Sequence, residues 1–178
     1  MCEVARRCGA EVVRVEADWG HALDPATLLE AQRAHSGARV VATVHAETST
    51  GVRNDIEPLS ARQETDTLLL VDAVTSLGGI PLDVDAWGID ACYSGTQKCL
   101  GVPPGLAPVT FSERAVARIG DRESPPQSWY LDLGLIGSYV GAERRYHHTA
   151  PISMVYALHA GLDVLLDEGL EASWDRHA

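Results

Sequence analysis

Basic residues are scarce in this sequence: 14 lysines and arginines stand against 25 aspartates and glutamates, a formal net charge of −11. Such a surface repels phosphate backbones, which argues against a nucleic-acid partner. Long apolar runs are also missing, so no segment reads as a membrane span and we expect no membrane partner. A secretory signal and a peroxisomal tripeptide are absent as well, and we therefore expect a cytoplasmic protein.

Cysteines are few, and no two of them form a CxxC pair. The four are Cys2, Cys8, Cys92 and Cys99, a pattern that fits a reducing compartment and scattered small core residues. His147 and His148 are adjacent, but no cysteine or carboxylate set stands at ligand spacing around them. We therefore expect no metal site, and a hydrogen-bonded structural role for the two histidines.

What the sequence does contain is an alternation of short β-branched runs with helical patterns. Strands are predicted at 11–15, 39–44, 68–71, 91–93 and 107–111, and helices at 1–8, from 24–25 to about 35, from 57–58, and from 152 onward. Asp24-Pro25, for example, is typical of a helix N-cap followed by its first residue. The length suits one domain. The prediction is an α/β fold with a mostly parallel sheet covered by helices.

Polar residues follow three of the predicted strands. They lie at His45–Gly51, at Asp72–Gly79 and at Ser94–Lys98. In a parallel sheet these segments share one end, the carboxyl end of the strands, where ligands bind. The sequence therefore predicts a ligand site at this end of the sheet.

The residues at these strand ends suit a cofactor that carries a pyridine ring and an aldehyde. Lys98 offers a primary amine that can form an imine. Asp72 offers a carboxylate that can keep the ring nitrogen protonated, and Thr48 or Gln97 could contact a phenolic oxygen. Each signal alone is weak, because a lone Asp at a strand end is commonly a cap or turn former and a lone Lys is usually a surface charge.

Four stretches of the sequence resemble one family. They are His45–Gly51, Val71–Gly79, Tyr93–Lys98 and Tyr146–Pro151, and the similarity extends to the final Gly169–Trp174. Together they resemble the class V aminotransferases, most closely the alanine–glyoxylate and serine–pyruvate aminotransferase group. The motifs Gly-Thr-Gln-Lys and Tyr-His-His-Thr, in this order, are the specific part of the match. The resemblance covers essentially the whole chain.

The resemblance implies the large domain of the fold-type I transferases, with pyridoxal 5′-phosphate as cofactor. Lys98 would be the catalytic residue, holding the cofactor as a Schiff base and moving the α-proton. Asp72 would pair with the pyridinium nitrogen, and Val74 would pack on the ring. Thr48 and Gln97 would contact the phenolic oxygen.

The resemblance also implies partners. Tyr146 and Thr149 would reach the cofactor phosphate of a neighbouring subunit, which implies a homodimer. The substrates would be a small amino acid, alanine or serine, and a 2-oxo acid, glyoxylate or pyruvate. No other macromolecular partner is implied.

Complete members of the family are longer than this chain. We therefore expect residues 1–178 to be a partial large domain, truncated at both ends, without the N-terminal segment and the C-terminal small domain. On that expectation the chain alone would be a poor enzyme. Two alternatives stay open: a non-catalytic remnant with weak or no cofactor binding, and a cysteine desulfurase-type lyase of the same fold. The second has no support in these residues, because the loop cysteine that such enzymes use as nucleophile would lie beyond them and Cys99 is too close to Lys98 to be on that loop.

Overall fold

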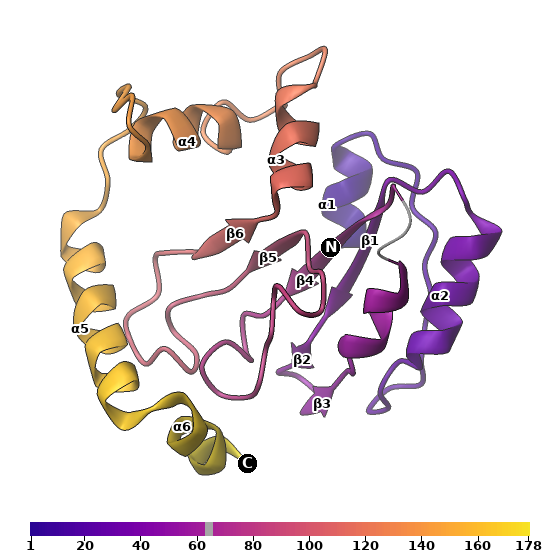
Figure 1. Cartoon of the computed structure of the whole chain (residues 1–178), viewed down its shortest axis with the longest axis horizontal. Coiled ribbons are helices and arrows are strands. Elements are labelled where there is room, and N and C mark those ends of the chain that lie inside the picture. Colours follow the sequence, from indigo (N-terminus) through magenta and orange to yellow (C-terminus); the bar gives the residue numbers. More distant parts are fainter. Residues whose placement is uncertain (63–65) are drawn as a thin grey trace.

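A four-stranded sheet is the centre of the computed structural model, which describes residues 1–62 and 66–178 (Figure 1). The strand order is β1 (Val40–Val44), β4 (Leu68–Asp72), β5 (Ala91–Tyr93) and β6 (Val109–Phe111). The first three strands run parallel and β6 is antiparallel to β5. The predicted mostly parallel α/β sheet is confirmed.

Helices flank the sheet, with α2 on the right and α5 on the left of Figure 1. The helices are α1 (Cys2–Arg7), α2 (Pro25–Ala34), the 3₁₀ helix η1 (Glu57–Arg62), α3 (Glu113–Gly120), α4 (Leu133–Val140), α5 (Ile152–Glu168) and α6 (Leu170–His177). Two further strands, β2 (Ala46–Glu47) and β3 (Val52–Arg53), form a small antiparallel pair beyond β1. Among the described residues, no helix has the length and apolar character needed to cross a membrane.

Alternating residues of the parallel strands build the core. Val41 of β1, Leu69 and Val71 of β4 and Cys92 of β5 are buried, and η1 adds Leu59. Parallel strands covered on their faces need such apolar residues, because both sides of the sheet are packed. At α2, Asp24 accepts a hydrogen bond from the Ala26 N–H at 2.8 Å, which caps the helix start as predicted.

One of the predicted strands was wrong. Residues 11–15 form no strand, and Val13 is 52% exposed; a β-branched run becomes a strand only where a neighbouring strand pairs with it, and none of the described strands does. The helix predicted to start at 57–58 is present, and within the described residues it is the 3₁₀ helix η1. Ile56 and Leu59 both point into the core, and a 3₁₀ turn brings residues three apart onto one side.

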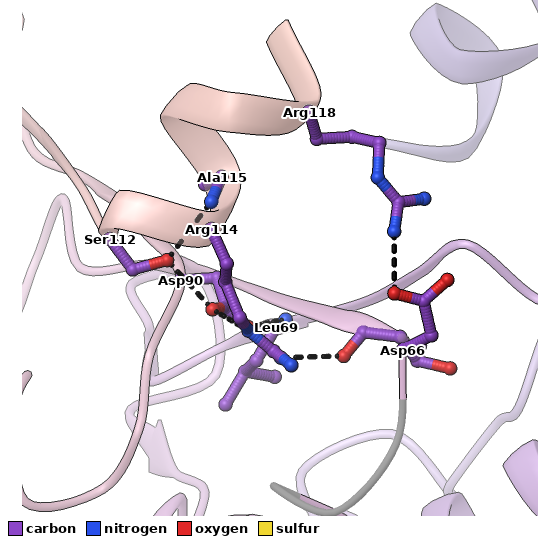
Figure 2. A network of polar contacts seen from close by, with 8 residues as sticks. Asp66, Leu69, Asp90, Ser112, Arg114, Ala115 and Arg118 are labelled. Atoms are coloured by element: carbon purple, nitrogen blue, oxygen red, sulfur yellow. Dashed lines mark hydrogen bonds and ion pairs between the residues drawn. The ribbon is translucent and has the colours of Figure 1, made fainter. Parts of the chain in front are cut away.

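A buried polar network closes the amino end of the sheet (Figure 2). Asp90, 3% exposed, precedes β5 and accepts from the Leu69 N–H at 2.8 Å and the Ser112 hydroxyl at 2.8 Å. Arg114 of α3 adds two donors, Nε at 2.6 Å and Nη2 at 2.7 Å. Burial opposes the charge on Asp90, but these donors together lower its pKa to about 2. The network ties α3 to β4 and β5.

Candidate active site at the carboxyl end of the parallel strands

The three polar segments predicted to share one end of the sheet do so. In register, Val44 of β1 pairs with Asp72 of β4, which in turn pairs with Tyr93 of β5. Hydrogen bonds continue one residue further, from the His45 N–H to the Asp72 carbonyl at 2.9 Å and from the Ala73 N–H to the Tyr93 carbonyl at 2.8 Å. The three segments that follow these strands therefore begin side by side at the same edge of the sheet.

Asp72 is half-buried, and each of its carboxylate oxygens accepts one hydrogen bond. Oδ1 accepts from the Val74 N–H at 2.9 Å, and Oδ2 accepts from the Tyr93 hydroxyl at 2.6 Å. Burial, followed by the hydrogen bond to Asp72 and its charge, raises the pKa of Tyr93, so the phenol stays protonated. A carboxylate has about four lone-pair positions, which leaves Asp72 able to accept a further donor.

Lys98 lies in a turn that follows β5 and is held by two backbone hydrogen bonds. The Gly101 N–H donates to the Lys98 carbonyl at 2.9 Å, and the Val102 N–H donates to the Thr96 carbonyl at 3.1 Å. Thr96 is fully buried, and its hydroxyl donates to the Pro103 carbonyl at 2.7 Å. The backbone that carries the Lys98 amine is therefore held by the fold itself.

The loop after β2 lies near this lysine. Ser49 donates to Glu47 Oε1 from its N–H at 2.9 Å and from its hydroxyl at 2.8 Å. These two bonds lower the pKa of Glu47, and the positive charge of Lys98 lowers it further. Thr48 lies between Glu47 and Ser49 in the sequence, and its hydroxyl is hydrogen-bonded to the Thr75 hydroxyl. This bond joins the loop after β2 to the loop after β4.

Val74 and Gln97 meet at Gly95, a buried glycine. A Cβ added at Gly95 would lie 2.8 Å from Gln97 Oε1 and 3.3 Å from Val74 Cγ1. Both side chains therefore lie against Gly95, and the amide at the end of the flexible Gln97 side chain could shift to admit a Cβ. The structure thus brings five of the seven predicted site residues to one end of the sheet: Thr48, Asp72, Val74, Gln97 and Lys98.

Tyr146 and Thr149 lie apart from these five residues. They belong to the link between α4 and α5, at the left of Figure 1, whereas β2, the strand before Thr48, is in the lower part of the picture. Both side chains are exposed, Tyr146 by 74%, and their hydroxyls are 3.2 Å apart. Within the described part of the chain, neither is hydrogen-bonded to the other five predicted site residues. Their predicted reach to a neighbouring subunit stays a prediction.

His147 and His148 form the expected hydrogen-bonded pair. Their Nδ1 atoms are 2.7 Å apart, and His147 Nε2 is 3.0 Å from the Trp129 carbonyl. A carbonyl only accepts, so His147 carries its proton on Nε2 and a neutral pair requires His148 to donate from Nδ1. His147 is buried, with its ring centroid 4.1 Å from that of Trp129. The pair anchors the segment that carries Tyr146 and Thr149.

His45 lies at the carboxyl end of the parallel strands, and the sequence did not reveal its environment. Its ring is 1% exposed, and neither nitrogen has a hydrogen-bond partner among the described residues. Trp87 packs edge-on against it, with ring centroids 5.8 Å apart. Burial, and then the charge of Arg53, lowers the pKa of His45 to about 4, against an opposing effect of Asp55. The imidazole is therefore neutral at physiological pH.

Tyr93, Thr75 and Cys99 also support the site, and the sequence did not predict these roles. The role of Tyr93 depends on the pairing of β4 with β5, which places it opposite Asp72 and which the sequence alone does not display. Cys99 donates from Sγ to the Thr75 carbonyl at 3.0 Å, and burial raises its pKa. A protonated, packed thiol of this kind is a poor nucleophile.

The donor set fits a pyridine aldehyde. It combines a primary amine (Lys98), a carboxylate with unused lone pairs (Asp72), a hydroxyl (Thr48) and an amide (Gln97). The amine can bind an aldehyde, and the carboxylate can hold a protonated ring nitrogen. Within the described residues, no cluster of three or more histidines, cysteines and carboxylates could hold a metal ion.

Comparisons with known proteins agree with this chemistry. The family model described as aminotransferase class-V matches residues 1–178. The (S)-ureidoglycine–glyoxylate transaminase of Bacillus subtilis (strain 168) is 39% identical over 199 residues, covering 99% of this chain and 47% of the relative. The alanine–glyoxylate aminotransferase of Oryctolagus cuniculus is 40% identical over 182 residues, covering 98% and 45%.

A solved structure matches equally well. The alanine–glyoxylate aminotransferase from Nostoc sp. superposes with a TM-score of 0.94 at 46% identity, over 98% of this chain and 46% of that one. The chain therefore spans under half the length of the relatives it matches. Its sheet and helices are those of a fold-type I transferase.

Proposed function

Since the chain belongs to the class V aminotransferase family, we propose that residues 1–178 form part of the large domain of a pyridoxal-phosphate-dependent aminotransferase. The amino donor is a small amino acid, alanine or serine, and the acceptor is a 2-oxo acid, glyoxylate or pyruvate. Glyoxylate is part of the names of the three relatives described above, which supports this acceptor class. The observation that carries the proposal is the Asp72 carboxylate, held beside the loop of Lys98 with lone pairs to spare.

In this proposal each residue has a defined task. Bound pyridoxal phosphate supplies an electron-withdrawing pyridinium that stabilises negative charge at the substrate Cα. Asp72 would hold a proton at the ring nitrogen, and the Lys98 amine would hold the aldehyde carbon. Lys98 Nζ would also take the proton from the substrate Cα. Thr48 and Gln97 offer hydrogen bonds to the phenolic oxygen, and Val74 packs on the ring.

Borohydride reduction tests this assignment. The chain is mixed with pyridoxal phosphate and reduced, which makes even weakly formed bonds permanent, and the modified peptide is identified by mass spectrometry. Since the sequence holds a single lysine, Lys98, the label should map there, and Lys98→Arg should remain unlabelled. An unlabelled wild-type chain, or a label confined to the N-terminal amine, would overturn the proposal.

The proposed assembly is a homodimer in which Tyr146 and Thr149 contact the neighbouring subunit's cofactor phosphate. Their exposure and their separation from the other five residues support this arrangement. In an active assembly, mixed dimers of a Lys98→Ala subunit and a Tyr146→Phe/Thr149→Ala subunit carry one intact site. Partial recovery of transamination is expected. No recovery in verified mixed dimers would assign the two residues to their own chain's site.

A further inference from the structure

Tyr93 is tied to Asp72 through both its backbone and its side chain. Its carbonyl accepts from the Ala73 N–H at 2.8 Å, and its hydroxyl donates to Asp72 Oδ2 at 2.6 Å. The next residue, the buried Ser94, donates from its hydroxyl to the Ala73 carbonyl at 3.0 Å. The backbone and side-chain hydrogen bonds together thus fix the position of the Asp72 carboxylate relative to β5.

The two donors to Asp72 come from different elements. The Tyr93 hydroxyl reaches Oδ2 from β5, while the Val74 N–H reaches Oδ1 from the loop after β4. One donor per oxygen fixes the plane of the carboxylate as well as its position. The remaining lone pairs are then held in one orientation.

We propose that Tyr93 is a positioning residue for the ring nitrogen of the cofactor: its hydroxyl holds the Asp72 carboxylate in the one orientation that accepts a protonated ring N–H. The inference rests on the proposed function, because it takes Asp72 as the partner of that nitrogen. Tyr93 itself does not touch the reacting atoms. It acts through Asp72.

The first test needs no cofactor. Urea unfolding of the chain is measured for Tyr93→Phe, Asp72→Ala and the double variant. If the hydroxyl bonds to the carboxylate, the losses of the two single variants add up to more than the loss of the double variant. Strictly additive losses would show that the bond does not form in solution, and would overturn the inference. Tyr156→Phe, at an exposed tyrosine of α5, is the matched control.

The second test separates positioning from general damage. Tryptophan fluorescence follows the binding of pyridoxal phosphate and of its analogue in which carbon replaces the ring nitrogen. Tyr93→Phe should weaken binding of pyridoxal phosphate by roughly three- to tenfold, the loss of one hydrogen bond. It should leave the analogue's affinity unchanged, because the analogue offers Asp72 no ring N–H. Equal weakening of both ligands would assign Tyr93 a purely structural role and overturn the inference.

The two proposals fail in different ways. If the wild-type chain binds neither ligand, the proposed function fails, and the inference about the ring nitrogen fails with it. If the wild type binds pyridoxal phosphate but Tyr93→Phe does not discriminate between the ligands, the inference alone fails.

Discussion

The two ends of the parallel sheet each hold an aspartate, and the two are used differently. Asp90 at the amino end is 3% exposed and accepts hydrogen bonds from Leu69, Ser112 and Arg114. Asp72 at the carboxyl end is half-buried and accepts two. One carboxylate has its hydrogen-bonding capacity filled by the protein, and the other retains part of it.

Other polar groups follow the same division. At the carboxyl end, the ring of His45 and the hydroxyl of Ser76 are buried without hydrogen-bond partners among the described residues. Leaving polar groups unsatisfied costs stability, so a fold keeps few of them. The comparison teaches that the amino end serves stability, while the unused hydrogen-bonding capacity is concentrated at the end predicted to bind a ligand.

The largest effect is expected at Asp90. Asp90→Ala leaves the Leu69 N–H without its acceptor and Arg114 without its partner, and should lower the free energy of unfolding by about 3 kcal/mol in urea titrations. Asp85→Ala, at an exposed neighbour, is the control and should change it little. If Asp90→Ala unfolds at the same urea concentration as wild type, the amino end is not the stabilising end.

Acid should weaken the same network. The pKa of Asp90 is lowered to about 2 from 3.8, so its contribution is complete above the unfolded value and is lost as the pH falls through the folded one. Wild type should therefore lose stability between about pH 4 and pH 2 more steeply than Asp90→Ala.

His45 gives the next largest effect, in a different pH window. Its pKa is lowered from 6.5 to about 4. Between these two pH values the unfolded chain therefore binds a proton that the folded chain does not bind. Stability is complete above pH 6.5 and should fall by about 2–3 kcal/mol as the pH drops towards 4. His45→Phe, which keeps a ring against Trp87, should remove this slope. His159→Gln, at an exposed histidine, should retain it; an unchanged slope in His45→Phe would assign the titration to another group.

Asp72→Asn should affect ligand binding more than folding. Its charge-assisted bond to a ring N–H is lost, so pyridoxal phosphate should bind about 2 kcal/mol more weakly, while the urea midpoint changes little. Fluorescence titration and urea unfolding of one preparation measure both. A large stability loss with unchanged affinity would make Asp72 the structural counterpart of Asp90, and the contrast between the two ends would disappear.

The smallest effect is expected at a surface ion pair near the Asp90 network. Arg118 Nη2 lies 2.6 Å from Asp66 Oδ1, whose side chain is 89% exposed (Figure 2). Exposed pairs contribute about 0.2–1 kcal/mol, so Arg118→Gln should shift the urea midpoint barely measurably. A loss as large as that of Asp90→Ala would extend the stabilising network to the surface.

Sequence patterns predicted the elements whose signal is local. The apolar run of β4, the cap at Asp24 and the polar residues after β1, β4 and β5 were found this way. The predicted strand at 11–15 failed, because pairing depends on a neighbour that propensity does not specify.

The roles of single side chains were harder to predict. Arg114 and Asp90 are 24 residues apart, and Tyr93 and Asp72 are 21 apart. Which of these residues meet follows from strand order and register, which one sequence does not display. The family resemblance gave the site residues, while the residues that support them required the structure.

The hydroxyl of Ser173 in α6 donates to the carbonyl of Gly78, 95 residues earlier, at 2.7 Å. Gly78 follows the loop that begins with Asp72, and a Cβ there would lie 3.1 Å from Leu165 of α5. During synthesis the chain emerges from its N-terminus. The bond between Gly78 and Ser173 therefore cannot form until α6 has left the ribosome. The β4 strand can pair early, but the loop after it gains its last native contact only when the helices that follow have folded back.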